Sequence, residues 1–115
     1  MDRIHETYNE YSGYDWCYTN TNAMVVSAAL LYGGGDFAKT ICTAVQAAFD
    51  TDCNGATAGS LTGVMLGKLA IPEYWYAVFH SELESSIIGY PRMTVEELTE
   101  RTLVLIDQNS PNERT

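Results

Sequence analysis

The stretch that decides the fold is Leu30–Trp75, which reads LLYGGGDFAKTICTAVQAAFDTDCNGATAGSLTGVMLGKLAIPEYW. Three consecutive glycines near its start end a helix that we predict over residues 23–32, with Asn22 as its N-cap. Asp36 then caps a second helix over residues 37–49, in which apolar residues recur at steps of three and four, the period of one helical face. Two helices joined by a glycine-rich turn predict a helical hairpin.

A third helix, predicted from about Gly55 to Leu69, carries glycines at four-residue intervals. Gly59, Gly63 and Gly67 each lower helix stability by roughly 1 kcal/mol relative to alanine. The close approach of another backbone to this glycine face would compensate for that loss. We therefore predict that this helix lies at the centre of a bundle.

The sequence downstream of this stretch predicts two further helices. Pro72 suits the first turn of a short helix, and we expect three aromatic residues to anchor it to the core: Trp75, Tyr76 and Phe79. Thr94 and Glu97 have the spacing of a capping box. They predict a last helix, Val95–Ile106, whose expected buried side chains are Leu98, Leu103 (or Thr102) and Ile106.

The chain is therefore predicted to be all-α, a compact multi-helix bundle with one core. A chain of 115 residues buries roughly two thirds of its unfolded surface, which is enough for a single core. Residues 1–19 are expected to be an irregular, aromatic-rich lead-in, because Ser12-Gly13 breaks a helix there. The helical domain is expected to span residues 20–107, and residues 108–115 to be a tail.

Charge and hydropathy exclude two classes of partner. Fifteen acidic against six basic residues give a net charge of −9 and a pI near 4.4. Because no Lys/Arg cluster exists to neutralise phosphates, we expect no nucleic-acid partner. The longest apolar run, Ala23–Tyr32, has about half of the roughly 20 residues in a spanning helix, so we expect no membrane partner. Cys17, Cys42 and Cys53 form no CxxC pair, which favours free thiols in the cytoplasm.

The candidate site is the stretch DTDCN, residues 50–54, between the second and third predicted helices. Asp50 and Asp52 can point at one hard cation such as Mg²⁺, Mn²⁺ or Ca²⁺. At the C-terminal end of a helix, Asp50 would face the negative end of the macrodipole, a conflict that a cation relieves. The alternative is that Asp52 or Asn54 only caps the helix beginning near Gly55. The pattern alone leaves both interpretations open.

An EF-hand is excluded as the type of site. The first, third, fifth and sixth positions of an EF-hand loop are matched by Asp50, Asp52, Asn54 and Gly55. The twelfth position requires a bidentate glutamate, but Leu61 occupies it. The residues after Gly55 read as continuous helix instead of a calcium loop.

The order of these motifs resembles the ADP-ribosylglycohydrolase family. In that family two helices, the aspartate motif, a glycine-bearing helix and an Ile-Pro-x-x-Trp segment follow one another, as they do in Leu30–Trp75. The resemblance implies a helical fold around two metal ions, Mg²⁺ or Mn²⁺. It also implies hydrolysis of the bond that joins ADP-ribose to an acceptor. The partner would be an ADP-ribosylated protein or a small ADP-ribose conjugate, with the acceptor left open.

By the same resemblance, Asp50 and Asp52 are metal ligands. Cys53 takes the place of a Thr or Ser whose hydroxyl also coordinates in many members of the family. A thiol is a poor ligand for a hard ion, which leaves the third ligand open. Asn54 would orient Asp52 as a hydrogen-bond partner behind it.

The rest of the implied site has no counterpart in this sequence. The family's other ligands come from an N-terminal region with a glutamate and a Thr-Asp-Asp motif, and no Asp-Asp pair occurs here. The glutamate that handles the water lies in that region too, so no catalytic residue is assigned. We therefore expect the C-terminal part of such a hydrolase, inactive without the N-terminal half of the same fold as its partner. The alternative, from a different class, is a non-catalytic helical module of this fold that binds a partner or a nucleotide.

Two histidines and one aromatic–amide segment are expected to have structural roles. His5 and His80 have no carboxylate at readable spacing, so we expect surface or core positions for both. The segment 14–22 could line a nucleotide pocket, but helix entry with Asn22 as the cap is the preferred interpretation.

Overall fold

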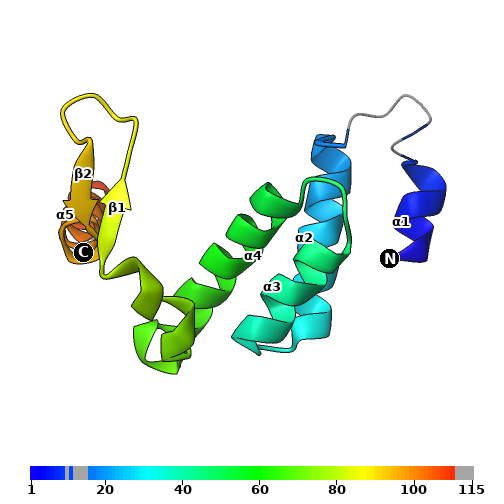
Figure 1. Cartoon of the computed structure of the whole chain (residues 1–115), viewed down its shortest axis with the longest axis horizontal. Helices are drawn as coiled ribbons and strands as arrows, with labels where there is room; N and C mark the ends of the chain where they lie inside the picture. Colours follow the sequence, from blue (N-terminus) through cyan, green and yellow to red (C-terminus); the bar gives the residue numbers. More distant parts are fainter. Residues whose placement is uncertain (10, 12–15, 111–115) are drawn as a thin grey trace, which may run out of the picture. The chain divides into compact units, whose positions relative to one another are not determined.

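The computed structural model describes residues 1–9, 11 and 16–110, most of which are helical (Figure 1). The all-α class is confirmed, with one small two-stranded sheet in addition. The α-helices in the described part are α1 (Asp2–Thr7), α2 (Thr19–Gly33), α3 (Phe37–Gln46), α4 (Thr51–Leu66) and α5 (Val95–Asn109). The chain forms two compact units, Met1–Pro72 and Glu73–Thr115.

The first unit is a bundle in which α2, α3 and α4 pack on one another (Figure 1). Its buried core is made of small apolar side chains: Val25, Ala29, Ala44, Ala47 and Ala58. Met1, Ile4 and Phe49 pack against this core. The lead-in expected to be irregular thus contains helix α1, while Ser12-Gly13 lie outside the described residues. The domain limits at residues 20 and 107 stay a prediction.

Helix α2 begins earlier than predicted, and Asn22 is not its N-cap. Tyr18 is the N-cap residue, and the backbone N–H of Asn22 already bonds to the Tyr18 carbonyl at 3.0 Å. Asn22 therefore lies in the first turn, where its side chain is free to bond elsewhere. Gly34, with φ of 60°, ends the helix in the left-handed region, as the glycine run predicts.

The connection between α3 and α4 is tighter than predicted. Asp36 caps α3 as expected, because its side chain accepts from the N–H of Lys39 at 2.7 Å. The helix ends at Gln46 instead of Phe49, since Ala48 and Phe49 have φ of 62° and 56°. Helix α4 then begins at Thr51, four residues before the predicted start.

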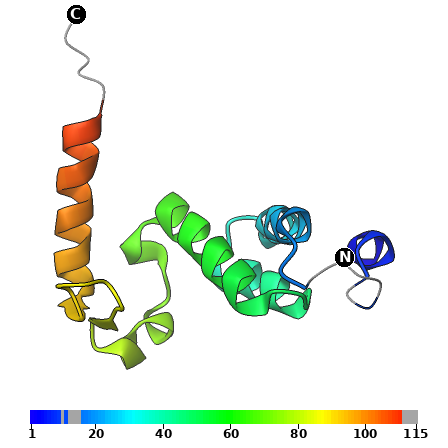
Figure 2. The same ribbon diagram turned by 90° about the horizontal axis from the view of Figure 1, so that it is seen from above.

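Helix α4 lies beside α3 in the first unit (Figure 2), and two of the three glycines predicted to pack closely do meet neighbouring side chains. A Cβ on Gly59 would lie 3.3 Å from Ile41 of α3, and one on Gly63 would lie 3.9 Å from Phe37. The close neighbours are side chains, not a backbone. The prediction is wrong for Gly67, which has φ of 73° and ends the helix. Its role is that of a terminating glycine.

The second unit is less buried than the sequence suggested. Two 3-10 turns, Glu73–Trp75 and Ala77–Phe79, replace the predicted short helix. A third, Lys68–Ala70, follows α4 in the first unit, where the predicted third helix was expected to end. Trp75 is half-buried, but Tyr76 and Phe79 are 40% and 59% exposed, so the expected anchoring by all three is wrong. Strands β1 (Glu82–Glu84) and β2 (Arg92–Thr94) form an antiparallel hairpin.

Helix α5 starts where the capping residues place it, but it does not bury the predicted side chains. Thr94 Oγ1 accepts from the N–H of Glu97 at 3.0 Å. Leu98, Leu103 and Ile106 are 42%, 59% and 55% exposed, because β2 is the main element that packs on α5. Among the described residues, no helix is long and apolar enough to cross a membrane.

Candidate metal site

The three predicted metal ligands meet at the first turn of α4. Among the described residues, Asp50, Asp52 and Cys53 are the group whose ligand atoms all lie within 4.8 Å of one another. Asp50 is only 4% exposed, whereas Asp52 and Cys53 are exposed. One carboxylate is thus held inside the bundle, and the other two groups face solvent.

The position of Asp50 corrects the expected electrostatics. Asp50 is the N-cap residue of α4 and Asp52 lies in its first turn, so neither sits at the C-terminal end of a helix. The positive end of the α4 macrodipole faces both carboxylates and stabilises their charge. No electrostatic conflict therefore calls for a cation here. The cap interpretation that used Asp52 or Asn54 is also wrong, because α4 begins before both.

The loop that leads into Asp50 is fixed from α1. His5 Nε2 lies 3.0 Å from the carbonyl oxygen of Ala47 and forms a hydrogen bond with it. The His5 ring also stacks on Phe49, with centroids 4.4 Å apart and planes at 19°. Because Ala48 and Phe49 adopt the left-handed region, which side chains disfavour, this loop needs such support. His5 is thus half-buried, and its contacts support the loop before Asp50.

Asp50 does not use its carboxylate to cap α4. Its Oδ2 accepts instead from Asn22 Nδ2 at 2.7 Å, a bond that links α2 to the start of α4. Asn54 Nδ2 donates in turn to Asn22 Oδ1 at 3.3 Å. Asn54 was expected to orient Asp52, but its side chain bonds to Asn22, which in turn bonds to Asp50. A role for Asn54 behind Asp52 stays a prediction.

The link between Asn22 and Asp50 was not predicted from the sequence, although a signal was present. Asn22 precedes Val25, Val26 and Ala29 by three, four and seven residues, the spacing of one helical face. These three are buried, so an amide sits on the buried face of α2. A polar group there must find a partner, and such a position could have been recognised in advance.

The surroundings of Cys53 favour the neutral form of its thiol. A hydrogen bond to Asp50 raises its pKa above the usual value, and the negative charges of Asp50 and Asp52 act in the same direction. A protonated thiol binds a hard cation poorly, since metals bind the thiolate. The third ligand position is thus chemically the weakest of the three.

These residues fit a hard divalent ion in part. The carboxylates of Asp50 and Asp52, two positions apart at the start of α4, supply oxygen atoms of the kind that Mg²⁺ and Mn²⁺ prefer. An octahedral ion needs roughly six donors, so most of a shell would come from water or from groups other than these. The site can hold an ion from one side.

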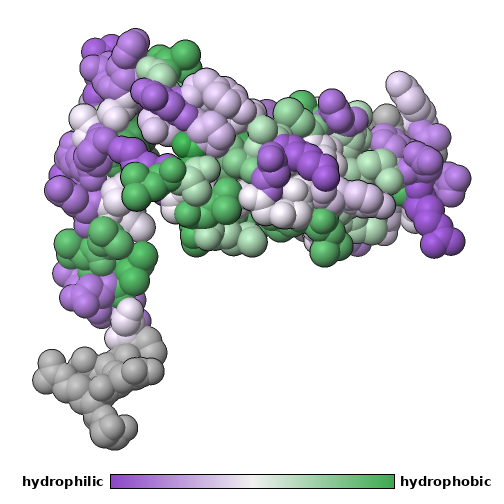
Figure 3. All heavy atoms as spheres, turned by 90° about the horizontal axis from the view of Figure 1, so that it is seen from below, coloured by the Kyte–Doolittle hydropathy of each residue, from purple (hydrophilic) through white to green (hydrophobic). Residues whose placement is uncertain are grey.

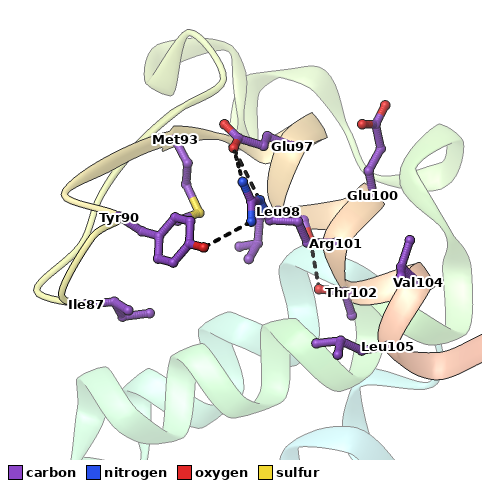
Figure 4. Close-up of a pocket in the computed structure, with 10 residues that line it drawn as sticks. All are labelled: Ile87, Tyr90, Met93, Glu97, Leu98, Glu100, Arg101, Thr102, Val104 and Leu105. Carbon is purple, nitrogen blue, oxygen red and sulfur yellow. Dashed lines mark hydrogen bonds and ion pairs between the residues drawn. The ribbon is translucent and has the colours of Figure 1, made fainter. Parts of the chain in front are cut away.

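A groove of about 710 Å³ lies in the second unit, on α5 and the loop before β2 (Figure 4). It is lined by Ile87, Tyr90, Met93, Glu97, Leu98, Glu100, Arg101, Thr102, Val104 and Leu105. Arg101 bonds to Glu97 at 2.9 Å and lies 4.7 Å from the centre of the Tyr90 ring. Its charge is paired, so the groove presents mainly apolar surface.

Comparison with known proteins assigns the family. No curated protein and no solved structure matches the chain. A family model, ADP-ribosylglycohydrolase, matches residues 1–112. The match includes the helical bundle, the Asp50–Asn54 turn and the whole of α5. The chain belongs to the ADP-ribosylglycohydrolase family.

Proposed function

We propose that this chain is the C-terminal, metal-binding part of a hydrolase that cleaves ADP-ribose from a protein side chain or a small conjugate. One observation carries the proposal. In a chain of this family, the ligand atoms of Asp50, Asp52 and Cys53 converge within 4.8 Å at the start of a helix. The complete site would hold two ions, Mg²⁺ or Mn²⁺.

The residues of this chain would hold and orient the ions. When bound, divalent ions neutralise the diphosphate of the substrate and position a water for attack at the anomeric carbon. Asp50, whose Oδ2 is anchored by Asn22, would be the fixed ligand. Asp52 is exposed on the same turn, so it would be the more mobile ligand. Cys53 offers a soft sulfur atom, which would contribute little to a hard ion.

We expect activity to require carboxylates in addition to those of Asp50 and Asp52. The sequence has no Asp-Asp pair, and the described residues contain no second cluster of His, Cys, Asp or Glu that could hold an ion. We propose that the N-terminal half of the fold supplies these ligands and the glutamate that handles the water. The three cysteines are exposed and form no disulfide with one another, which fits our proposal of a reducing, cytoplasmic location.

Metal binding is the first test. The chain is titrated calorimetrically with Mg²⁺ and Mn²⁺, and Asp50→Asn and Asp52→Asn are compared with Asp107→Asn, which removes the same charge from exposed α5. We expect weak binding that both site variants lower and the control does not. Binding that is the same in all four proteins would place the ion elsewhere and contradict the proposal.

Activity is the second test. The chain alone should release no ADP-ribose from a modified protein, because most ligands and the water-handling group are lacking. Joined to a segment that carries the family's glutamate and Thr-Asp-Asp motif, it should become active, and Asp52→Ala should abolish that activity. Robust hydrolysis by the isolated 115 residues would overturn the requirement for further ligands.

A non-catalytic module that binds a partner is the second candidate, and one surface favours it. Apolar residues gather on the C-terminal half of α5 (Figure 3). Leu103, Val104, Leu105 and Ile106 are all more than half exposed. A patch of this kind is typical of an interaction site. This alternative would be favoured if the Asp50 and Asp52 variants bind ions as the parent does, and if the chain stays inactive after it is joined to the N-terminal segment.

A further inference from the structure

We infer that Asn22 is a positioning residue for the metal site, which holds the Asp50 carboxylate in its ligand orientation from the neighbouring helix α2. The inference rests on the proposed function and adds a residue to it. Asn22 lies in the first turn of α2, far in sequence from the aspartate motif. Its contact with Asp50 spans 28 positions of the chain.

The direction of this hydrogen-bond relay is fixed by the chemistry of its end. An ionised carboxylate only accepts hydrogen bonds, so Asn22 must turn its NH₂ group toward Asp50, at 2.7 Å. The Asn22 carbonyl then faces Asn54, whose NH₂ group donates to it at 3.3 Å. The relay therefore runs from Asn54 through Asn22 to Asp50 and has one orientation.

Burial makes this relay rigid. Asn54 is 1% exposed and Asp50 is 4% exposed, so water competes little with either bond. A hydrogen bond to an ionised acceptor is stronger than one between neutral groups, and the 2.7 Å separation is typical of such a bond. Rotation of the Asp50 side chain would leave the Asn22 donor without this acceptor, which is costly for a partly buried amide.

The use of Asp50 at a helix N-cap supports the same role. An N-cap aspartate normally accepts from the backbone N–H groups of the first turn, but Asp50 makes no such bond. Without Asn22, that capping position becomes the natural alternative for its carboxylate. In that capping position the carboxylate would face the backbone N–H groups of α4 instead of the Asn22 side chain. Asn22 thus selects the orientation in which Oδ2 is anchored and the carboxylate stays beside Asp52 and the Cys53 thiol.

The experiment compares ion affinity among four variants of the full 115-residue chain. Mn²⁺ alone is the probe, and its paramagnetic broadening of the amide signals of residues 51–55 reports the bound fraction. Asn22→Ala removes the donor, and Asn22→Leu removes it while filling the space. Asn20→Ala is the matched control, because Asn20 is an exposed amide in the same turn whose side chain bonds Tyr18. Asp50→Asn reports on the site itself.

We expect both Asn22 variants to bind Mn²⁺ about 10-fold more weakly, the loss typical of removing a partner behind a metal ligand. Asn20→Ala should bind as the parent does. Circular dichroism and unfolding midpoints establish that each variant is folded at the titration temperature, and a purely structural role would lower the midpoint without changing the affinity of the folded chain. If the alanine variant unfolds, the leucine variant carries the comparison.

Failure of the positioning role and failure of the proposed metal site give different results. Parent-like affinity in a folded Asn22 variant, with loss in Asp50→Asn, would overturn the positioning role and leave the proposed function standing. Parent-like affinity in Asp50→Asn would show that the ion binds elsewhere, and the proposed function would fall with the inference.

Discussion

Replacing His5 with alanine should loosen the loop that leads into Asp50. The substitution removes the hydrogen bond to Ala47 and the stacking on Phe49. A net hydrogen bond contributes about 1 kcal/mol, and an aromatic pair contributes about 0.5–1.5 kcal/mol beyond its area. The first unit should therefore lose about 2 kcal/mol of stability, which is about 30-fold in its unfolding equilibrium.

Native-state hydrogen exchange measures this loss where it occurs. The amides of Val25 and Ala44 lie in the fully buried core of the first unit, so their exchange reports the opening of that unit and not of the second one. The control is His80→Asn, because His80 lies in the second unit with φ of 49°, a conformation that asparagine tolerates. Equal protection of these amides in His5→Ala and in the parent would show that His5 does not stabilise the first unit.

Three further outcomes follow from the packing and the site. Gly33→Ala should destabilise the first unit by about 1–3 kcal/mol in urea denaturation, because the added Cβ would lie 2.8 Å from the Thr40 Cβ. Gly59→Ala should be tolerated in the same assay, because its added Cβ would lie 3.3 Å from the flexible side chain of Ile41. Cys53→Thr should strengthen Mg²⁺ binding in a calorimetric titration, because a hydroxyl suits a hard ion better than a neutral thiol. Iodoacetamide should modify Cys53 more slowly than exposed Cys42 at pH 8.5, since the raised pKa keeps Cys53 protonated there. Equal alkylation rates by peptide mass spectrometry would contradict that last expectation.

The helical architecture could be predicted because its signals are local. Asp36 caps α3 and the glycine run ends α2, and each of these signals depends on the backbone conformation of a few adjacent residues. The Thr94 cap likewise fixes the start of α5. The grouping of Asp50 with Asp52 follows in the same way, because residues within one turn stay close whatever the rest of the chain does.

Three features could not be predicted, because they depend on contacts distant in sequence. The start of α4 at Thr51 requires left-handed backbone at Ala48 and Phe49, but neither position holds the glycine or asparagine that would predict such a conformation. The partner of Asn22 lies on another helix. The apolar side chains of α5 have the period of a buried face, but what lies over that face is not encoded in the helix itself.

The corrected start of α4 changes what an ion must do at this site. Had Asp50 ended a helix, a cation would have relieved a repulsion between the carboxylate and the negative end of the macrodipole. At the N-terminus of α4 the carboxylates are already stabilised by the positive end, so an arriving divalent ion is repelled by the same dipole that favours its ligands. The ion must therefore draw its binding energy from the number and rigidity of its ligands. This requirement is the reason that we propose Asn22 as the residue that holds Asp50 in place. It is also the reason that we expect these three groups to hold Mg²⁺ or Mn²⁺ weakly until further carboxylates join them.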